Sequence, residues 1–293
     1  MIFGLAEKVD FVTLSFVRTA EDIKQLRKLI GNKADVAIVA KIETKAAIMN
    51  LEAIVEEADV IMVARGDLAI EMPLEKVPLL QKKIIKTANE AGKPVITATQ
   101  MLDSMRVSTT PTRAEVTDIA NAILDGTDAL MLSDETAVGL HPEKAISIMT
   151  LVAKEIENDS YTSDLMSKWC FPSKTTCDTV SRSIATSARE VDAKVIIALS
   201  ESGHTARMIS RHRPLAQILV LTPNKTTLNK MLVVFGCEPI LVPHVKGLAS
   251  ARKIARKNII KGNLAEKGDN FIIGAGIPFG KSGSTNTMLI EHL

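Results

Sequence analysis

Two charged residues end an otherwise apolar segment early in the chain, in the sequence VAKIET at residues 39–44. Lys41 and Glu43 are two positions apart, so in a β-strand their side chains point to the same face. Charged groups are costly to bury unless they meet a ligand, a metal ion or each other. The pattern therefore predicts a metal or anion site, or else a Lys–Glu pair on a solvated strand end.

A second apolar segment runs into Arg65, Gly66 and Asp67, in the sequence VIMVARGDLAIE at residues 60–71. Gly66 lets the backbone approach a ligand closely, and N–H groups at a turn or helix start can receive an anion. Two carboxylates from neighbouring strands, completed by water and ligand oxygens, are typical of Mg²⁺ that bridges phosphates. We predict that Glu43 and Asp67 hold such an ion. Alone, the Arg-Gly-Asp sequence could form an ordinary turn.

Two later apolar runs also end in polar residues. KPVITATQML at residues 93–102 contains Thr99, whose hydroxyl could hold a substrate oxygen or merely satisfy the end of the strand. ALMLSDETAVG at residues 129–139 contains Ser133, Asp134 and Glu135, which an acidic helix start would explain almost as well. All four segments place their polar residues where a strand ends.

The elements that position these residues alternate between strand and helix. We expect strands at residues 9–16, 36–42, 60–64, 95–99 and 129–133, separated by amphipathic helices, which predicts βαβ units and a parallel sheet. Parallel α/β proteins keep their chemistry at the carboxyl ends of the strands, where these residues lie. The spacing suits a (β/α)₈ barrel, but five strands are three too few. Either the sheet is open, or something else supplies the missing strands and covers the exposed edges.

A polar stretch divides the chain. We expect a catalytic domain at residues 1–158, a linker at 159–175 and a second α/β domain at 176–293. In the second domain we expect helices and strands in alternation, with strands at residues 195–200, 218–222, 239–242 and 270–274. The chain is therefore predicted to have two domains.

The composition excludes several classes of protein. The 293 residues carry a formal charge of +2 with no long run of like charges, so nucleic acid is not the expected partner. No segment resembles a signal peptide or a membrane span, which predicts a cytoplasmic protein with no membrane association. Cys170, Cys177 and Cys237 show no metal-binding spacing and are expected to be reduced, buried thiols.

At these motifs the sequence resembles the pyruvate kinase family, from about residue 1 to the end. The matching segments are VAKIET, MVARGDLAIE, PVITATQML, the run from residue 111 to 139, and SGSTNTM at residues 282–288. The resemblance implies a (β/α)₈ barrel followed by a C-terminal α/β domain. It also implies an enzyme of glycolysis that transfers a phosphoryl group from phosphoenolpyruvate to ADP, giving pyruvate and ATP, with Mg²⁺ or Mn²⁺ and with K⁺.

The resemblance also implies roles for individual residues. Lys41 would steady the transferring phosphoryl group and the enolate, and Glu43 and Asp67 would bind the divalent metal. The backbone of Gly66 and Asp67 would bind the substrate carboxylate, and Thr99 would lie near the carbon that is protonated. Five further residues occupy family-like strand ends with less defined roles: Ser15, Phe16, Arg65, Ser133 and Glu135.

In the second domain the resemblance points to an effector loop that could hold a phosphate, facing a second loop at residues 280–285. The residues expected there are Ser200, Ser202, Gly203, His204, Thr205, Gly283 and Ser284. An ordinary polar loop with no ligand is the other interpretation, and effector identity varies in this family. The family's homotetramer predicts a homo-oligomer.

The sequence also departs from the family. It starts where the family's fourth barrel strand starts, so it lacks the first three strands, the inserted lid domain, the K⁺ ligands and much of the nucleotide pocket. Asp134 stands where the family usually has Gly. We therefore expect a truncated or split form that is impaired when alone, with a separate N-terminal fragment as one candidate partner. Two alternatives are a non-catalytic regulatory or binding subunit and a Mg²⁺-dependent lyase or aldolase acting on 2-keto acids.

Overall fold

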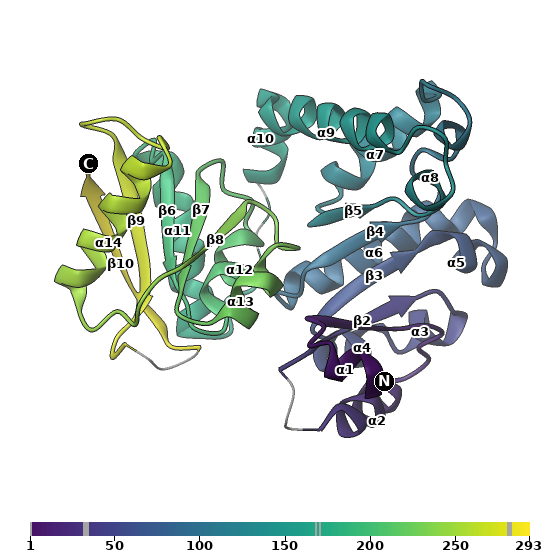
Figure 1. Ribbon diagram of the computed structural model, residues 1–293, viewed down its shortest axis with the longest axis horizontal. Helices are drawn as coiled ribbons and strands as arrows, with labels where there is room; N and C mark the ends of the chain where they lie inside the picture. Colours follow the sequence, from purple (N-terminus) through teal and green to yellow (C-terminus); the bar gives the residue numbers. More distant parts are fainter. Residues whose placement is uncertain (1, 32–34, 168, 170, 280–282) are drawn as a thin grey trace. The chain divides into compact units, whose positions relative to one another are not determined.

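The computed structural model describes residues 2–31, 35–167, 169, 171–279 and 283–293. The chain forms two compact units, Met1–Leu165 and Met166–Leu293 (Figure 1). Cys170 and residues 280–282, which the sequence analysis singled out, lie outside the described residues. Among the helices that are described, none is both long and apolar enough to cross a membrane.

The first unit is built on a five-stranded parallel sheet whose strand order follows the chain. The strands are β1 (Phe11–Leu14), β2 (Ala37–Ile42), β3 (Val60–Ala64), β4 (Val95–Ala98) and β5 (Ala129–Met131). Each strand lies within its predicted run but is in several cases shorter at the carboxyl end. Ser15, Phe16, Thr99 and Ser133 therefore lie in the loops that follow the strands.

Helices connect these strands and cover the sheet. They are α1 (Ile2–Ala6), α2 (Ala20–Ile30), α3 (Lys45–Met49), α4 (Leu51–Glu57), α5 (Arg65–Glu71), α6 (Val77–Glu90), α7 (Arg113–Leu124), α8 (Asp134–Ala137), α9 (Pro142–Asn158) and α10 (Ser160–Ser167), with short 3₁₀ turns η1 (Leu74–Lys76) and η2 (Asp103–Arg106). At the start of α7, Thr112 and Glu115 form a reciprocal capping box. Helix α10 occupies part of the stretch expected to be a linker, so residues 159–175 are not irregular throughout.

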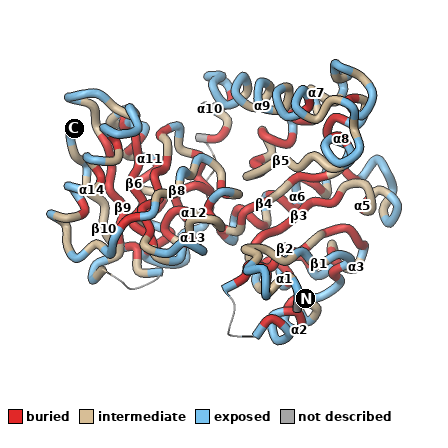
Figure 2. The backbone as a smooth tube through the Cα atoms, viewed as in Figure 1, coloured by how far each residue is buried: buried red, intermediate tan, exposed pale blue. Residues whose placement is uncertain are grey.

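Aliphatic side chains from the strands and helices form the core of the first unit. Every residue of β3 is buried, as is most of β2, and Figure 2 shows these strands as buried segments. Ile38 and Ile61 from the sheet share a core cluster with Ile54 of α4 and Ile84 of α6. Strands buried on both faces suit the near-continuous Val, Ile and Ala runs of this sequence. The outer strands β1 and β5 are only half-buried.

The second unit is a mixed five-stranded sheet in the order β10-β9-β6-β7-β8. Its strands are β6 (Val195–Leu199), β7 (Gln217–Thr222), β8 (Cys237–Leu241), β9 (Asn270–Gly276) and β10 (Thr285–His292), and its helices are α11 (Thr176–Glu190), α12 (His204–Ser210), α13 (Lys225–Met231) and α14 (Leu248–Lys261). Strand β10 is antiparallel to β9, and the other pairs are parallel. Strand β10 was not predicted, because its first residue, Thr285, was expected in a loop and residues 286–292 were assigned to no element.

Two separate core clusters show that helices cover both faces of this sheet. On one face, Ile184 of α11 and Ile209 of α12 pack against Ile196 of β6. On the other face, Ala255 of α14 packs in a cluster with Ile197 of β6. Neighbouring residues of one strand thus face opposite layers, as the strand period of two requires.

Candidate active site

One lysine lies between the two carboxylates that the sequence singled out. Lys41 Nζ is 2.8 Å from Glu43 Oε2 and 3.9 Å from Asp67 Oδ2, and it lies 3.4 Å from the hydroxyl of Ser15. These residues come from β2 or from the loops and helix that follow β1, β2 and β3. The structure therefore brings together residues from three neighbouring strand ends at the carboxyl edge of the sheet.

Glu43 is the most buried member of this group. Its side chain is fully buried, and Oε1 accepts a hydrogen bond of 2.5 Å from the backbone N–H of Phe16. Apart from Lys41, Oε2 has no hydrogen-bond partner among the residues that the structure describes. Asp67 is more open, with 43% of its side chain exposed. One carboxylate is thus fixed in place while the other faces solvent.

Thr99 forms a direct link between β4 and the start of α5. Its hydroxyl accepts a hydrogen bond of 2.9 Å from the backbone N–H of Gly66 and donates one of 2.6 Å to the carbonyl of Ala98. The Gly66 N–H that was expected to bind a substrate carboxylate is therefore paired with Thr99 in this structure. A ligand oxygen would have to replace the threonine hydroxyl to use that N–H group.

The loops after β1 and β4 have unusual backbone conformations. Phe16, Thr99 and Gln100 have φ values of 54°, 72° and 54°. A β-branched residue rarely adopts a positive φ, and each such residue costs on the order of 1–3 kcal/mol. Backbone conformations of this kind persist only where surrounding contacts enforce them, and they cluster at ligand sites. The side chain of Phe16 is nevertheless largely exposed, so it does not close the site.

Arg65 does not point into this group, although it was expected in the site wall. Its Nη2 donates to the carbonyl of Thr99 at 2.7 Å, its Nε donates to Ala98 O at 3.3 Å, and its Nη1 donates to Asp118 Oδ1 at 2.7 Å. The guanidinium is therefore engaged in holding the loop after β4 against α7. A role for Arg65 in the site wall stays a prediction, and in this structure its guanidinium holds the carbonyls of Ala98 and Thr99.

Glu135 is also buried, and it binds backbone groups instead of facing an open site. Only 2% of it is exposed, and its two oxygens accept from the backbone N–H groups of Leu102 and Ser133 at 3.0 Å and 2.8 Å. An exposed neighbour, Asp134, lies 3.7 Å from Arg106. A Cβ atom at Gly139 would collide with the carbonyl oxygen of Glu135, so the chain after α8 returns very close to its start.

The two carboxylates fit a divalent metal of the predicted kind. Mg²⁺ usually takes one or two protein carboxylates and completes its shell with water and substrate oxygens. Glu43 Oε2 is a buried oxygen with one cationic neighbour, and Asp67 faces the same ammonium from the solvent side. Within the described ranges, no group of three or more His, Cys, Asp or Glu residues could hold a metal on its own. The site would therefore need ligand oxygens to complete the shell.

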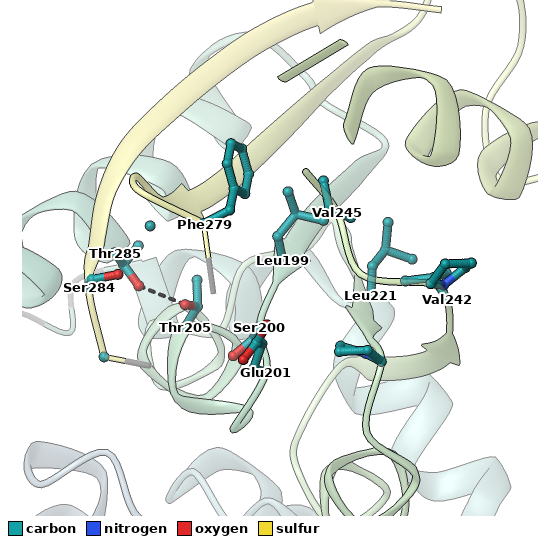
Figure 3. A pocket seen from close by; sticks show the side chains of 14 residues that line it. Leu199, Ser200, Glu201, Thr205, Leu221, Val242, Val245, Phe279, Ser284 and Thr285 are labelled. Carbon is teal, nitrogen blue, oxygen red and sulfur yellow. Dashed lines mark hydrogen bonds between the residues drawn. The ribbon is translucent and has the colours of Figure 1, made fainter. Parts of the chain in front are cut away.

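The second unit has a small pocket of about 50 Å³ beside the ends of β6 and β7. Figure 3 shows the side chains of Thr205 and Thr285 directed at each other, below apolar walls that include Leu199 and Phe279. The two hydroxyl oxygens are 2.7 Å apart. Glu201 also lines the pocket, so one carboxylate lies where a phosphate had been expected.

Only some of the predicted effector residues line this pocket. Ser200, Thr205, Gly283 and Ser284 line it, whereas Ser202, Gly203 and His204 are not among its lining residues. Glu201 and Thr285 lie within the two expected loops but were not among the residues predicted to hold the phosphate. Thr285 lies in the quoted SGSTNTM segment, but its burial against Thr205 depends on the strand that the sequence analysis missed.

The chain thus joins a parallel β/α unit of barrel type to a second α/β unit with helices on both faces. Residues 1–146 match the family model "Pyruvate kinase, barrel domain", and residues 178–291 match "Pyruvate kinase, alpha/beta domain". The chain belongs to the pyruvate kinase family. The predicted fold class, an incomplete (β/α)₈ barrel followed by the C-terminal domain of this family, is confirmed.

Individual relatives agree with this assignment. The pyruvate kinase of Clostridium acetobutylicum is 40% identical over 294 residues, covering 99% of this chain and 62% of the relative. That of Geobacillus stearothermophilus is 41% identical, covering 99% of this chain and 50% of the relative. The crystal structure of a pyruvate kinase from Cryptosporidium parvum has a TM-score of 0.90 and 36% identity, covering 99% of this chain and 60% of that one. The chain therefore spans about half to three-fifths of the length of these relatives.

Proposed function

We propose that the chain supplies part of a pyruvate kinase active site, which transfers a phosphoryl group from phosphoenolpyruvate to ADP in glycolysis. The observation that carries this proposal is the contact of one ammonium, that of Lys41, with both Glu43 and Asp67 at the carboxyl edge of the sheet. Phosphoryl transfer mostly requires positioning and neutralisation of negative charge, and this group offers both. Membership of the family supports the same assignment.

Each residue of the site would have a distinct role in the phosphoryl transfer. The bond between the enol oxygen and phosphorus breaks, the phosphoryl group passes to a terminal oxygen of ADP, and the enolate takes a proton at its terminal carbon to give pyruvate. Lys41 would lie against the transferring group and the enolate oxygen, since its ammonium is held at the mouth of the site by Glu43. Thr99 would lie beside the carbon that is protonated, and the backbone of Gly66 and Asp67 would receive the substrate carboxylate.

Glu43 and Asp67 are the residues that would hold a divalent ion. Bound Mg²⁺ or Mn²⁺ would neutralise charge on the phosphate and on the enolate oxygen. The Glu43 carboxylate is oriented beforehand by the backbone N–H of Phe16, so it needs little rearrangement. The more exposed Asp67 can adjust to the ligand.

The proposal can be tested on this chain by the exchange of pyruvate methyl protons with solvent, which needs a metal and the enolate site but no ADP. We expect exchange that depends on Mg²⁺, with Glu43→Gln shifting the Mg²⁺ titration to higher concentration. Glu71→Gln, a change at an exposed carboxylate at the end of α5, is the matched control. An unchanged titration in Glu43→Gln would remove this residue from the metal site.

The complete reaction would be assayed with and without an added N-terminal fragment. The mass of the particle would show whether a homo-oligomer or a complex forms.

The pocket of the second unit supports one other function, that of a regulatory or binding subunit. A phosphorylated effector would use Ser200, Thr205 and Ser284, which line the pocket together. Titration calorimetry with sugar phosphates and nucleotides tests this function, and Ser284→Asp should abolish any binding by like-charge repulsion. Failure to bind any phosphorylated metabolite would count against it. The lyase or aldolase alternative is not favoured, because residues 178–291 match the second domain of pyruvate kinases.

A further inference from the structure

The turn that carries Thr99 is held on two sides. On one side, the guanidinium of Arg65 binds the carbonyls of Ala98 and Thr99. On the other side, the carboxylate of Glu135 accepts from the backbone N–H of Leu102. Between these two anchors lie Thr99 and Gln100, two consecutive residues with positive φ. Neither residue type favours that conformation, so external contacts must maintain it.

Glu135 is suited to this task because each of its oxygens receives a different backbone N–H. Oε1 binds Leu102 in the loop after β4, and Oε2 binds Ser133 in the loop after β5. The carboxylate therefore joins the ends of two neighbouring strands. An amide in its place would accept with one oxygen but would direct an NH₂ group at the second N–H. Because the residue is buried, water cannot substitute for the lost bond.

We propose that Glu135 is a positioning residue for Thr99. It fixes the Thr99–Leu102 turn and with it the place of the threonine hydroxyl, which in this structure accepts from the N–H of Gly66. The inference rests on the proposed function for the role of Thr99, but the geometry of the turn can be tested separately. Glu135 acts through the backbone of Leu102 and Ser133, whose N–H groups bind its two oxygens.

A second carboxylate cap in the same region, the half-buried Glu115, provides the control. The carboxylate of Glu115 accepts from the backbone N–H groups of Ser104 and Thr112, both at 2.7 Å, and from the hydroxyl of Ser104 at 2.6 Å. It anchors the start of α7 to the 3₁₀ turn η2, and none of these hydrogen bonds involves residues 99–102. Glu115→Gln therefore removes a carboxylate that, like Glu135, caps two backbone N–H groups, without releasing the turn of Thr99.

The experiment compares Glu135→Gln with Glu115→Gln in the full 293-residue chain. Unfolding in urea should show a loss of stability for both variants, larger for the buried Glu135 than for the half-buried Glu115. Amide hydrogen exchange should accelerate at residues 99–102 and at Ser133 only in Glu135→Gln. Saturating rates of Mg²⁺-dependent proton exchange on pyruvate should fall by about ten- to a hundredfold in Glu135→Gln, as expected for a misplaced reacting group. The Mg²⁺ concentration at half-saturation should stay unchanged.

Equal rates and equal local exchange in the two variants would overturn the proposal. If the unchanged chain catalyses no proton exchange on pyruvate, the proposed function fails at this step, and amide exchange then decides the role of Glu135. Selective acceleration at residues 99–102 supports the positioning role in that case, and its absence refutes it. If Glu135→Gln does not fold, Glu135→Asp, which keeps the charge but shortens the reach, gives the same comparison.

Discussion

At the scale of single residues, the ion pair between Lys41 and the buried Glu43 contributes to the stability of the fold as well as to the candidate active site. Lys41→Met would leave a fully buried carboxylate without its ammonium partner. We expect the free energy of unfolding to fall by roughly 3–5 kcal/mol. The double variant Lys41→Met/Glu43→Gln removes both charges and should recover most of that loss. Urea denaturation measures both values, and equal losses in the single and double variants would contradict this account.

The stability of the second unit should depend on pH through the buried His212. Its ring lies 5.6 Å from that of Phe171, and burial, followed by the nearby charges of Arg211 and Arg182, lowers its pKa to about 4, although Asp178 acts in the opposite direction. The unfolded chain takes up this proton near pH 6.5, whereas the folded chain does so only near pH 4. Stability is therefore complete above pH 6.5 and is lost progressively as the pH falls to about 4, by about 3 kcal/mol.

Replacing the ring should remove that dependence. We expect His212→Gln to flatten the stability of the second unit between pH 6.5 and 4, as measured by denaturation at a series of pH values. His244→Gln, at a histidine with 69% of its side chain exposed, is the control and should retain the slope. A slope that survives in His212→Gln would assign the acid sensitivity to another group.

Spacing in the sequence predicted one part of the candidate site well. The period of two placed Lys41 and Glu43 on one face, and their ion pair confirms that geometry. The roles of these residues remain predictions. The reach of Glu135 across two strand ends and the positive φ of Thr99 could not be predicted, because both depend on contacts between segments that are distant along the chain.

At the scale of elements, the backbone at Gly139, just after the short helix α8, lies very close to the backbone of Glu135 within that helix. A side chain at Gly139 would collide with the backbone carbonyl of Glu135, and a backbone atom cannot move aside as a flexible side chain can. We expect Gly139→Ala to destabilise the first unit by about 1–3 kcal/mol through overpacking. Gly4→Ala in α1, where a Cβ would meet Val9 at an ordinary 3.7 Å, is the control and should be nearly neutral. Thermal unfolding of both variants tests this expectation.

Strands and helices differed in how clearly the sequence predicted them. The parallel strands appeared as apolar runs because burial on both faces selects Val, Ile and Ala. Strand β10 was missed because it is an antiparallel edge strand, and its polar residues Thr285, Asn286 and Thr287 resemble a loop. Helix α10 was missed because the polar stretch around it has few apolar residues, so its helical period is weak.

At the scale of the whole molecule, each unit has its own hydrophobic core. Ile54 is fully buried in the first unit, and Ile197 is fully buried in the second. We expect two unfolding transitions, with Ile54→Ala shifting one and Ile197→Ala the other, each by roughly 2–5 kcal/mol. Tryptophan fluorescence and circular dichroism followed over one urea titration would separate them. Identical shifts of a single transition in both variants would show that the units unfold as one.

The different strand orders of the two sheets have a consequence for synthesis on the ribosome. In the first unit each new strand pairs with the strand made just before it, so the sheet can grow as the chain emerges. In the second unit, the central strand β6 pairs with β9 only after β7, β8 and α14 have been made, and the hydroxyl pair Thr205–Thr285 joins residues 80 positions apart. During translation one edge of β6 therefore stays open, and this is the interval in which a nascent chain would depend on a chaperone.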